Sequence, residues 1–199
     1  MNLVTGVKLL EFGRRFYDRL YSFFIKKGLS CFSKSCIISS DATIKGGKYV
    51  KIGDYTVFAR HSVITAWDRY LNQRFDPQIS IGTNCSFGEF CHISAISEVI
   101  IGNHVLTGRR VTITDNSHGL FSKDELDVPP LMRPLYSKGI ISIGDNVWIG
   151  ENVVIMANVQ IGKGTIIGAG SIVTHDIPPY SLAVGNPAKV IKTFIHDNF

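Results

Sequence analysis

A repeat of six residues constrains the fold of this chain more than any other feature of its sequence. From residue 143 the chain divides into hexads that each open with an aliphatic residue: IGDNVW, IGENVV, IMANVQ, IGKGTI, IGAGSI and VTHDIP. A period of six fits neither a plain strand nor a helix. It fits a short strand followed by a corner, with the aliphatic side chain inside and Gly, Asn or Asp in the turn. Three hexads then form one coil of a triangular prism, and stacked coils bury a column of Ile and Val.

The same period appears earlier in the chain. The hexads of residues 81–98 are IGTNCS, FGEFCH and ISAISE, and those of 101–118 are IGNHVL, TGRRVT and ITDNSH. Weaker copies begin at Ile38, and the hexad starts together predict about five coils. Two stretches, 67–78 and 119–140, break the period and must leave the prism as loops. Long loops in a compact domain are usually functional or disordered, and the apolar residues of 119–140 favour an ordered one.

Composition and charge place the chain among folded globular proteins. Hydrophobic residues make up 45% and charged residues 19% of the 199 residues, which excludes a disordered chain. The net charge of +5 is too small for a nucleic-acid-binding footprint but suits an anionic ligand or membrane surface. None of the cysteines forms a C-x-x-C motif, no secretory signal is apparent, and the apolar clusters are too short to span a bilayer. We therefore expect a cytoplasmic protein with reduced thiols.

The two ends of the chain differ from the repeat region. Residues 3–27 alternate apolar and basic side chains, which predicts an amphipathic helix. Because a solenoid needs a cover over its open end, we assign 1–35 to an N-terminal helical cap. Contact of residues 3–27 with a membrane surface is compatible with that role. The β-helix then spans 36–178, and residues 179–199 form a C-terminal extension that turns back on it.

The hexad array, the loop after His118 and the sequence IGDNVWIGENVVIMANVQIGKGTIIGAGSIVTHDIPPYSLAVGNPAKVIK resemble the hexapeptide-repeat acyltransferases. The branch it resembles contains galactoside, maltose and polysaccharide O-acetyltransferases, and the resemblance covers roughly residues 36–195. It implies an all-β fold, a left-handed parallel β-helix, whose hand runs against the usual crossover rule. It also implies a homotrimer that binds acetyl-CoA between neighbouring subunits, so that two chains share each active site.

The resemblance assigns the general base to the His that closes a coil before the large loop, here His118. A sugar hydroxyl is a poor nucleophile at neutral pH, and an imidazole within hydrogen-bond reach can accept its proton. Asp115 and Glu89 are the candidates for the acceptor that orients the far nitrogen of this ring. Galactoside-type members place a substrate-binding Asn one coil earlier, where hexad counting puts Gly88. That departure argues against a simple galactoside as the acceptor.

The family pattern for CoA carries over onto seven positions of this chain. Trp148 occupies an outward position, where a ligand or a subunit interface should cover it. Lys189 and Lys192 would meet the phosphates as point charges, although related members often have Arg there. For either Lys alone, a solvated surface residue is the simpler interpretation. The implied cofactor-binding residues are Trp148, Glu151, Ala169, Thr174, His175, Lys189 and Lys192.

The acceptor site carries no diagnostic spacing. Aromatic and charged residues of the two loops suit a polyol, and the candidates are Arg133, Tyr136, Lys138, Trp67, Asp68 and Arg69. We expect a sugar or surface-polysaccharide precursor as the acceptor, with an antibiotic or an amino sugar as the alternative. Serine O-acetyltransferases carry a longer N-terminal helical domain than residues 1–35 allow.

Two alternatives belong to other classes. A zinc-dependent hydratase of the same repeat family needs three converging His. His92 is the residue expected to approach His118, and two His do not complete a zinc site, so we expect no metal. A non-catalytic trimeric scaffold would explain the repeats but would leave the CoA pattern of 143–192 without a role.

Overall fold

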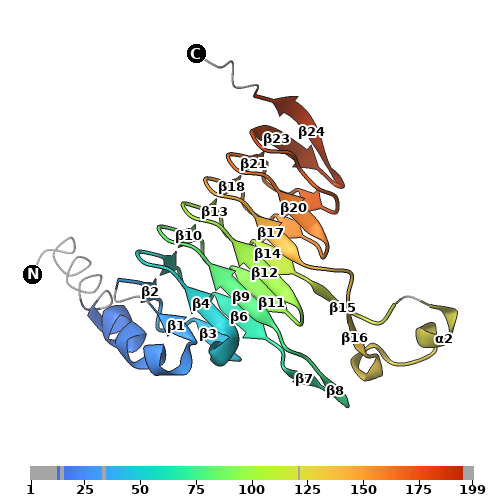
Figure 1. The fold of residues 1–199 in the computed structure, drawn as a ribbon, viewed down its shortest axis with the longest axis horizontal. Helices are drawn as coiled ribbons and strands as arrows, with labels where there is room; N and C mark the ends of the chain where they lie inside the picture. Colours follow the sequence, from blue (N-terminus) through green and yellow to red (C-terminus); the bar gives the residue numbers. More distant parts are fainter. Residues whose placement is uncertain (1–12, 14–15, 33–34, 121, 195–199) are drawn as a thin grey trace, which may run out of the picture.

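The computed structural model describes residues 13, 16–32, 35–120 and 122–194. Their strands stack into a three-sided prism of six coils, and the polypeptide advances one strand per face around each coil (Figure 1). The fold is a left-handed parallel β-helix, as the sequence predicts. The hexads suggest about five coils, and the further coil arises because a strand at residues 31–32 pairs with residues 51–52. The first strand of the β-helix therefore lies within the segment that the sequence assigns to the cap.

Each face of the prism is a ladder of short parallel strands. Among the described strands of the three faces, only the last two of the second face pair antiparallel. The first face consists of β1 (Cys31–Phe32), β4 (Val50–Ile52), β9 (Gln78–Ile81), β12 (Glu98–Ile101), β17 (Ile141–Ile143) and β20 (Val159–Ile161). The second face consists of β2 (Ile37–Ile38), β5 (Val57–Phe58), β10 (Ser86–Phe87), β13 (Leu106–Thr107), β18 (Trp148–Ile149), β21 (Ile166–Ile167), β23 (Ser181–Gly185) and β24 (Ala188–Thr193). The third face consists of β3 (Thr43–Lys45), β6 (Val63–Ala66), β11 (His92–Ala95), β14 (Thr112–Thr114), β19 (Val154–Ile155) and β22 (Ile172–Val173).

The residues that open the hexads form the core, as the period predicts. On the third face Ile93, Ile113 and Ile155 are in register on successive coils, and each is fully buried. The corners use left-handed backbone conformations, for example at Asn146 and Asn152, with φ of 58° and 56°. Asn tolerates this region better than most residues, which explains why it recurs at the corner of the hexad.

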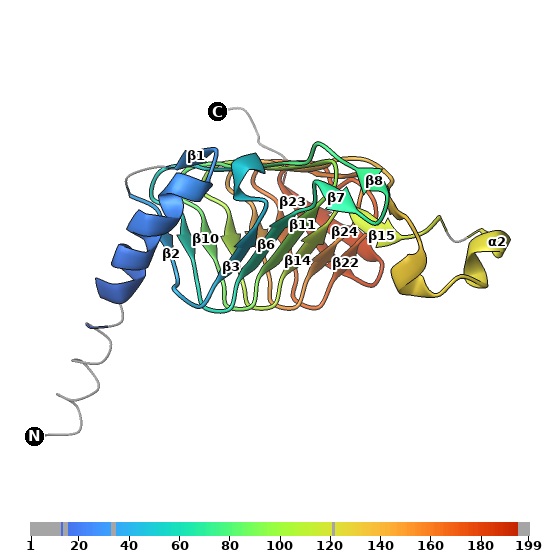
Figure 2. The same cartoon turned by 90° about the horizontal axis from the view of Figure 1, so that it is seen from below.

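A helix covers the first coil. Residues 16–25 are helical and continue into the 3-10 turn η1 (Lys26–Gly28), and they lie against the N-terminal end of the prism (Figure 2). The buried Ser22 hydroxyl accepts a 2.8 Å hydrogen bond from the amide of Ile38. Asp18 accepts a 2.7 Å bond from the amide of Ser40, and the Tyr21 hydroxyl donates to the Ala42 carbonyl at 3.3 Å. One side of this helix is therefore bonded to the strand edge of the first coil. The rest of the expected helix, within 3–27, lies outside the described residues.

Two excursions leave the third face, one after β6 on the second coil and one after β14 on the fourth, with β11 between these strands. The first is a hairpin of β7 (Arg69–Tyr70) and β8 (Gln73–Arg74). The second is an arm that begins with the antiparallel pair β15 (Asn116–His118) and β16 (Leu135–Ser137). Its tip carries α2 (Lys123–Leu126) and the 3-10 turn η3 (Pro130–Met132), which project away from the prism (Figure 1). His118 is therefore the last residue of β15, at the base of the arm, where it pairs with Leu135 of β16. It does not lie at a corner of the prism.

Asp41 stabilises a corner of the first coil through its hydrogen bonds, and this stabilisation depends on pH in the acid range. Burial alone would raise its pKa, but hydrogen bonds from the His61 amide, Ser39 and Arg60 outweigh burial and lower the pKa from 3.8 to about 2. A lowered pKa contributes stability above the unfolded value, and that stability is lost as the pH falls towards 2. Because solvent screens this partly exposed group, we expect it to account for about 1 kcal/mol of the acid-dependent loss.

Urea unfolding from pH 5 to pH 2 measures this effect. The free energy of unfolding of Asp41→Asn should fall less steeply between pH 4 and 2 than that of the parent chain. Asp124→Asn, in α2 on the arm, serves as the control and should keep the parent slope. Parallel pH profiles for Asp41→Asn and the parent would rule out this contribution.

Candidate active site

The hairpin and the arm enclose a hollow on the third face, which we call the hairpin pocket. Its volume is about 300 Å³. Strands β11 and β14 form its floor, the hairpin one wall and the arm the other. The residues that line it are Trp67, Tyr70, His92, Ser94, Thr114, Asn116, His118, Leu131 and Leu135.

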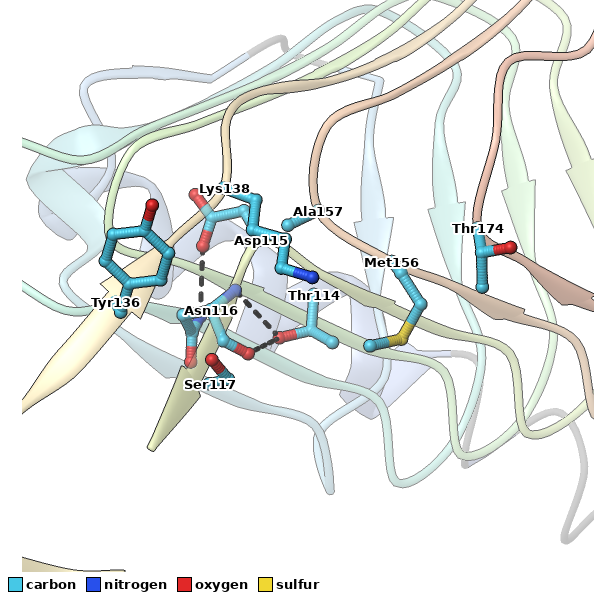
Figure 3. Close-up of a pocket in the computed structure, with 9 residues that line it drawn as sticks. All are labelled: Thr114, Asp115, Asn116, Ser117, Tyr136, Lys138, Met156, Ala157 and Thr174. Carbon is cyan, nitrogen blue, oxygen red and sulfur yellow. Dashed lines mark hydrogen bonds between the residues drawn. The ribbon is translucent and has the colours of Figure 1, made fainter. Parts of the chain in front are cut away.

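A second hollow, the edge pocket, adjoins the first along the edge of the third face towards the C-terminal coils. It has a volume of about 170 Å³ and shares Thr114 and Asn116 with the hairpin pocket. Figure 3 shows Tyr136 and Lys138 of the arm on one side of it, and Met156 and Thr174 of later coils on the other. The two pockets together form a continuous surface from His118 to Thr174.

The His118 ring lies against Tyr70. Its Nδ1 is 3.4 Å from the Tyr70 hydroxyl, and the two rings meet edge to face with centroids 5.4 Å apart. The Tyr70 hydroxyl donates its one proton to the Leu131 carbonyl at 2.7 Å. Its oxygen can therefore only accept from Nδ1, which favours the tautomer with the proton on Nδ1. Nε2 then keeps its lone pair and can take up a proton.

Long-range hydrogen bonds join the two excursions and fix the walls of the hairpin pocket. The Gln73 side chain accepts from the Leu135 amide at 2.7 Å and donates to the Leu135 carbonyl at 3.1 Å. Since Leu135 pairs with His118 in the β15–β16 ladder, Gln73 ties the hairpin to the strand beside His118. Ser94 on the floor accepts hydrogen bonds from the Trp67 indole and the Asn116 amide, at 3.3 and 3.0 Å.

Asp115 is fully buried, and its carboxylate is bonded to backbone amides of the preceding coil. Its carboxylate accepts from the amides of Ile96 and Ser97 at 2.9 and 2.8 Å, and from the Asn116 side chain at 3.0 Å (Figure 3). Burial raises the pKa of Asp115, and these hydrogen bonds oppose that effect. Asp115 therefore ties one coil to the next, and the group in contact with the His118 ring is Tyr70.

Glu89 and Gly88 lie at the other end of the third-face strands from His118, at the corner between β10 and β11. Glu89 pairs with Arg109 at 3.5 Å, so it does not orient His118 within one chain. A Cβ on Gly88 would lie 2.3 Å from the Gly108 carbonyl oxygen, so this position serves coil stacking. Within one chain Gly88 lines neither pocket, and its contact with the substrate stays a prediction.

His92, the residue that the sequence analysis expects near His118, lines the hairpin pocket together with it. It is the first residue of β11, and it faces outward because the next residue, Ile93, is in the core. The alternation of inward and outward residues along this strand places its side chain on the side of the pocket. Burial lowers the pKa of His92 below its usual value, so its ring is neutral at pH 7 and can donate one hydrogen bond and accept one.

The candidate acceptor residues separate in the structure. Trp67 lines the hairpin pocket and packs edge to face on Tyr70, and Tyr136 and Lys138 line the edge pocket. Arg133 instead folds the tip of the arm, because its guanidinium donates to the carbonyls of Val128 and Leu126. Asp68 anchors the foot of the hairpin: it pairs with Lys48 at 3.1 Å and accepts from Tyr49 at 3.2 Å.

The residues implied for CoA fall into three groups on one chain. Trp148 lies half exposed on the second face, and Glu151 and Ala169 occupy the corner where the second face passes into the third. Thr174 and His175 follow β22 at the opposite end of the third face, joined by a 2.8 Å hydrogen bond, and Thr174 lines the edge pocket. The remaining two, Lys189 and Lys192, lie on β24.

The described residues contain neither a cluster of metal-binding side chains nor a membrane-spanning helix. In this part of the chain no three His, Cys, Asp or Glu side chains lie close enough together to hold a metal ion. Within the same ranges no helix combines the length and the apolar character needed to cross a membrane.

Comparison with known proteins bears on the repeat and on the fold. Residues 141–175 match the family described as bacterial transferase hexapeptide (six repeats), which confirms the resemblance noted in the sequence. The putative lipopolysaccharide biosynthesis O-acetyl transferase WbbJ of Escherichia coli K12 is 37% identical over 60% of this chain and 62% of its own length. A probable macrolide acetyltransferase of Lysinibacillus sphaericus is 40% identical over 59% of this chain and 64% of its own length.

Among solved structures, the N-acyltransferase AntD of Bacillus cereus has a TM-score of 0.71 with 19% identity over 86% of each chain. That structure contains dTDP and 3-hydroxybutyryl-CoA. At this identity the similarity establishes the fold alone. The matches to the two curated relatives span less than two thirds of their lengths.

Proposed function

We propose that this chain, a hexapeptide-repeat β-helix, transfers an acetyl group from acetyl-CoA to a hydroxyl of a sugar or a surface-polysaccharide precursor. The observation that carries the proposal is the His118 ring, held by Tyr70 in a pocket beside a segment that matches the transferase hexapeptide family. The relative named as an O-acetyl transferase of lipopolysaccharide biosynthesis supports the oxygen acceptor and its class.

His118 acts as the general base in this reaction. Acetyl-CoA supplies a thioester carbonyl that an oxygen nucleophile can attack. The Nε2 lone pair accepts the proton of the acceptor hydroxyl as its oxygen bonds to the carbonyl carbon. The Tyr70 oxygen accepts a hydrogen bond from Nδ1–H and thereby stabilises the charged ring. When the carbon–sulfur bond breaks, His118 returns the proton to the departing thiolate, so the imidazole ends neutral and free CoA leaves.

The residues of the edge pocket fit the CoA arm. Met156 and Ala157 supply an apolar surface beside Thr174, which suits the thin pantetheine chain. Lys189 and Lys192 are exposed on β24 and add positive charge for the phosphates. We assign acetyl-CoA binding to Trp148, Glu151, Ala169, Thr174, His175, Lys189 and Lys192.

The division of these residues between two ends of the third face argues for a homotrimer with shared sites. Trp148, Glu151 and Ala169 do not line the edge pocket of their own chain. A neighbouring copy of the chain is therefore needed to place its own Trp148, Glu151 and Ala169 beside this pocket. On the second face one line of register runs through Val57, Ser86, Leu106 and Trp148, and its three apolar members are 36%, 49% and 51% exposed. An exposed apolar column of this kind suits a subunit interface.

The hairpin pocket suits a sugar ring. Trp67 and Tyr70 offer apolar ring surfaces, and Ser94, Asn116 and His92 offer hydrogen-bonding groups.

The buried, unpaired thiols of Cys85 and Cys91 fit a reducing compartment, and we place the reaction in the cytoplasm.

A second acceptor class deserves a direct comparison because a relative is named a probable macrolide acetyltransferase and AntD is an N-acyltransferase. The experiment is a screen with labelled acetyl-CoA against sugar nucleotides, lipid-linked oligosaccharides, amino sugars and macrolides. We expect label on a sugar or polysaccharide precursor, in a product that alkali cleaves, because an ester is labile where an amide is stable. Alkali-stable label on an amine, or label confined to macrolides, would replace the proposed acceptor. Absence of transfer to any acceptor would favour a scaffold role.

A further inference from the structure

The helix of residues 16–25 has two different faces, and only one of them packs against the prism. Ser22 and Asp18 face the first coil and are bonded to it. Phe16, Leu20 and Phe24 follow at intervals of four residues and therefore lie on one side of the helix. They are 64%, 43% and 63% exposed, and Tyr17 beside them is 60% exposed. Capping of the prism leaves this side, which we call the outer helix face, in contact with solvent.

The outer helix face carries more apolar surface than a cap needs. Phe23 adds to it, 61% exposed, and packs edge to face on Phe24 with centroids 5.6 Å apart. Single exposed apolar residues are ordinary, whereas a contiguous aromatic patch on one helix face marks an interaction site. None of these side chains contributes to the hairpin pocket or the edge pocket.

The charges around this face select its partner. Arg19 and Lys27 are exposed on the same segment. Asp18 is the one acidic residue between positions 13 and 40, and its carboxylate accepts from the Ser40 amide on the first coil. The described charges beside the outer face are thus cationic. Two copies that met through this face would bring cations together, so the charge disfavours self-association and favours an anionic surface.

We propose that the outer helix face docks on an anionic lipid bilayer. Phe16, Leu20 and Phe24 enter the boundary between headgroups and acyl chains, and Arg19 and Lys27 meet the lipid phosphates. This inference goes beyond acyl transfer and does not depend on it. Docking would hold the β-helix at the membrane surface with its first coil nearest the lipid.

Vesicle flotation with the full chain tests the proposal. We expect the protein to float with vesicles of phosphatidylcholine and phosphatidylglycerol, and to float weakly with phosphatidylcholine alone. Arg19→Gln/Lys27→Gln should weaken binding to the anionic vesicles roughly 30-fold and reduce its dependence on salt. Phe16→Ser/Leu20→Ser/Phe24→Ser should abolish flotation. Tyr55→Ser/Phe90→Ser removes two exposed aromatic residues from corners of the prism and should float like the parent.

Circular dichroism and transfer to a soluble acceptor check that the triple variant is folded, and they separate this proposal from the proposed function. Failure of the parent chain to bind anionic vesicles would overturn the proposal, as would equal flotation of the folded triple variant. Light scattering identifies the competing occupant. A smaller oligomer for the triple variant, without vesicle binding by the parent, would assign the outer helix face to a second copy of the chain and would also overturn it.

Discussion

Replacement of His118 by alanine is expected to lower the rate of acetyl transfer by a factor on the order of 10²–10⁴. Without the imidazole, the acceptor hydroxyl must lose its proton to water while its oxygen attacks the thioester. Binding of acetyl-CoA should be unchanged, because the residues assigned to it lie on other coils. Steady-state kinetics with labelled acetyl-CoA would show the loss in kcat, and calorimetry would show the retained affinity.

The fold of the variant should survive the substitution. The His118 side chain is exposed, and its backbone pairs with Leu135 regardless of the side chain. His104→Ala is the matched control, because His104 is an exposed corner His remote from both pockets, and its transfer rate should equal that of the parent. Near-parent transfer by His118→Ala would remove His118 from the mechanism. A change in oligomeric state would instead show that the arm stabilises the proposed trimer.

The hexad pattern predicted the prism because the first residue of each hexad must be apolar to fill the core. Ile143, Ile149 and Ile155 each begin a hexad, and each is buried on a different face of the fifth coil. The period did not give the hand of the coil, for which the family resemblance was needed, since the usual crossover rule predicts the opposite. The first strand was assigned to the cap because the recognised hexad starts begin at Ile38, after Cys31 and Phe32.

The site was harder to predict because it is built where the period stops. His118 could be singled out from its position before the large loop, but Tyr70 lies 48 residues away in the other excursion. Gln73 and Leu135 are 62 residues apart and meet only because both excursions leave the same face. Nothing in a local pattern pairs such segments. Asp115 is close to His118 in sequence, but its carboxylate accepts hydrogen bonds from backbone amides of the preceding coil.

The largest expected loss of stability comes from Phe87→Ala. Aliphatic residues dominate the core, yet Phe58 and Phe87 stack in it on successive coils, with centroids 4.4 Å apart and rings 3° from parallel. Each is 1% exposed. Removal of the Phe87 ring leaves a cavity that neighbouring coils cannot close, because their spacing is fixed by the backbone ladders on either side. We expect the free energy of unfolding to fall by about 3–5 kcal/mol.

Phe90, three residues further along, provides the matched control for that experiment. It is 47% exposed at a corner, where its ring stacks on His61 with centroids 4.8 Å apart. Phe90→Ala removes the same number of atoms from the same coil but opens no cavity, so its cost should stay below about 1 kcal/mol. Urea denaturation of both variants at one protein concentration compares them directly. Equal losses would mean that the aromatic stack does not hold the third coil on the second, and that the backbone ladders and corners alone determine how the coils stack.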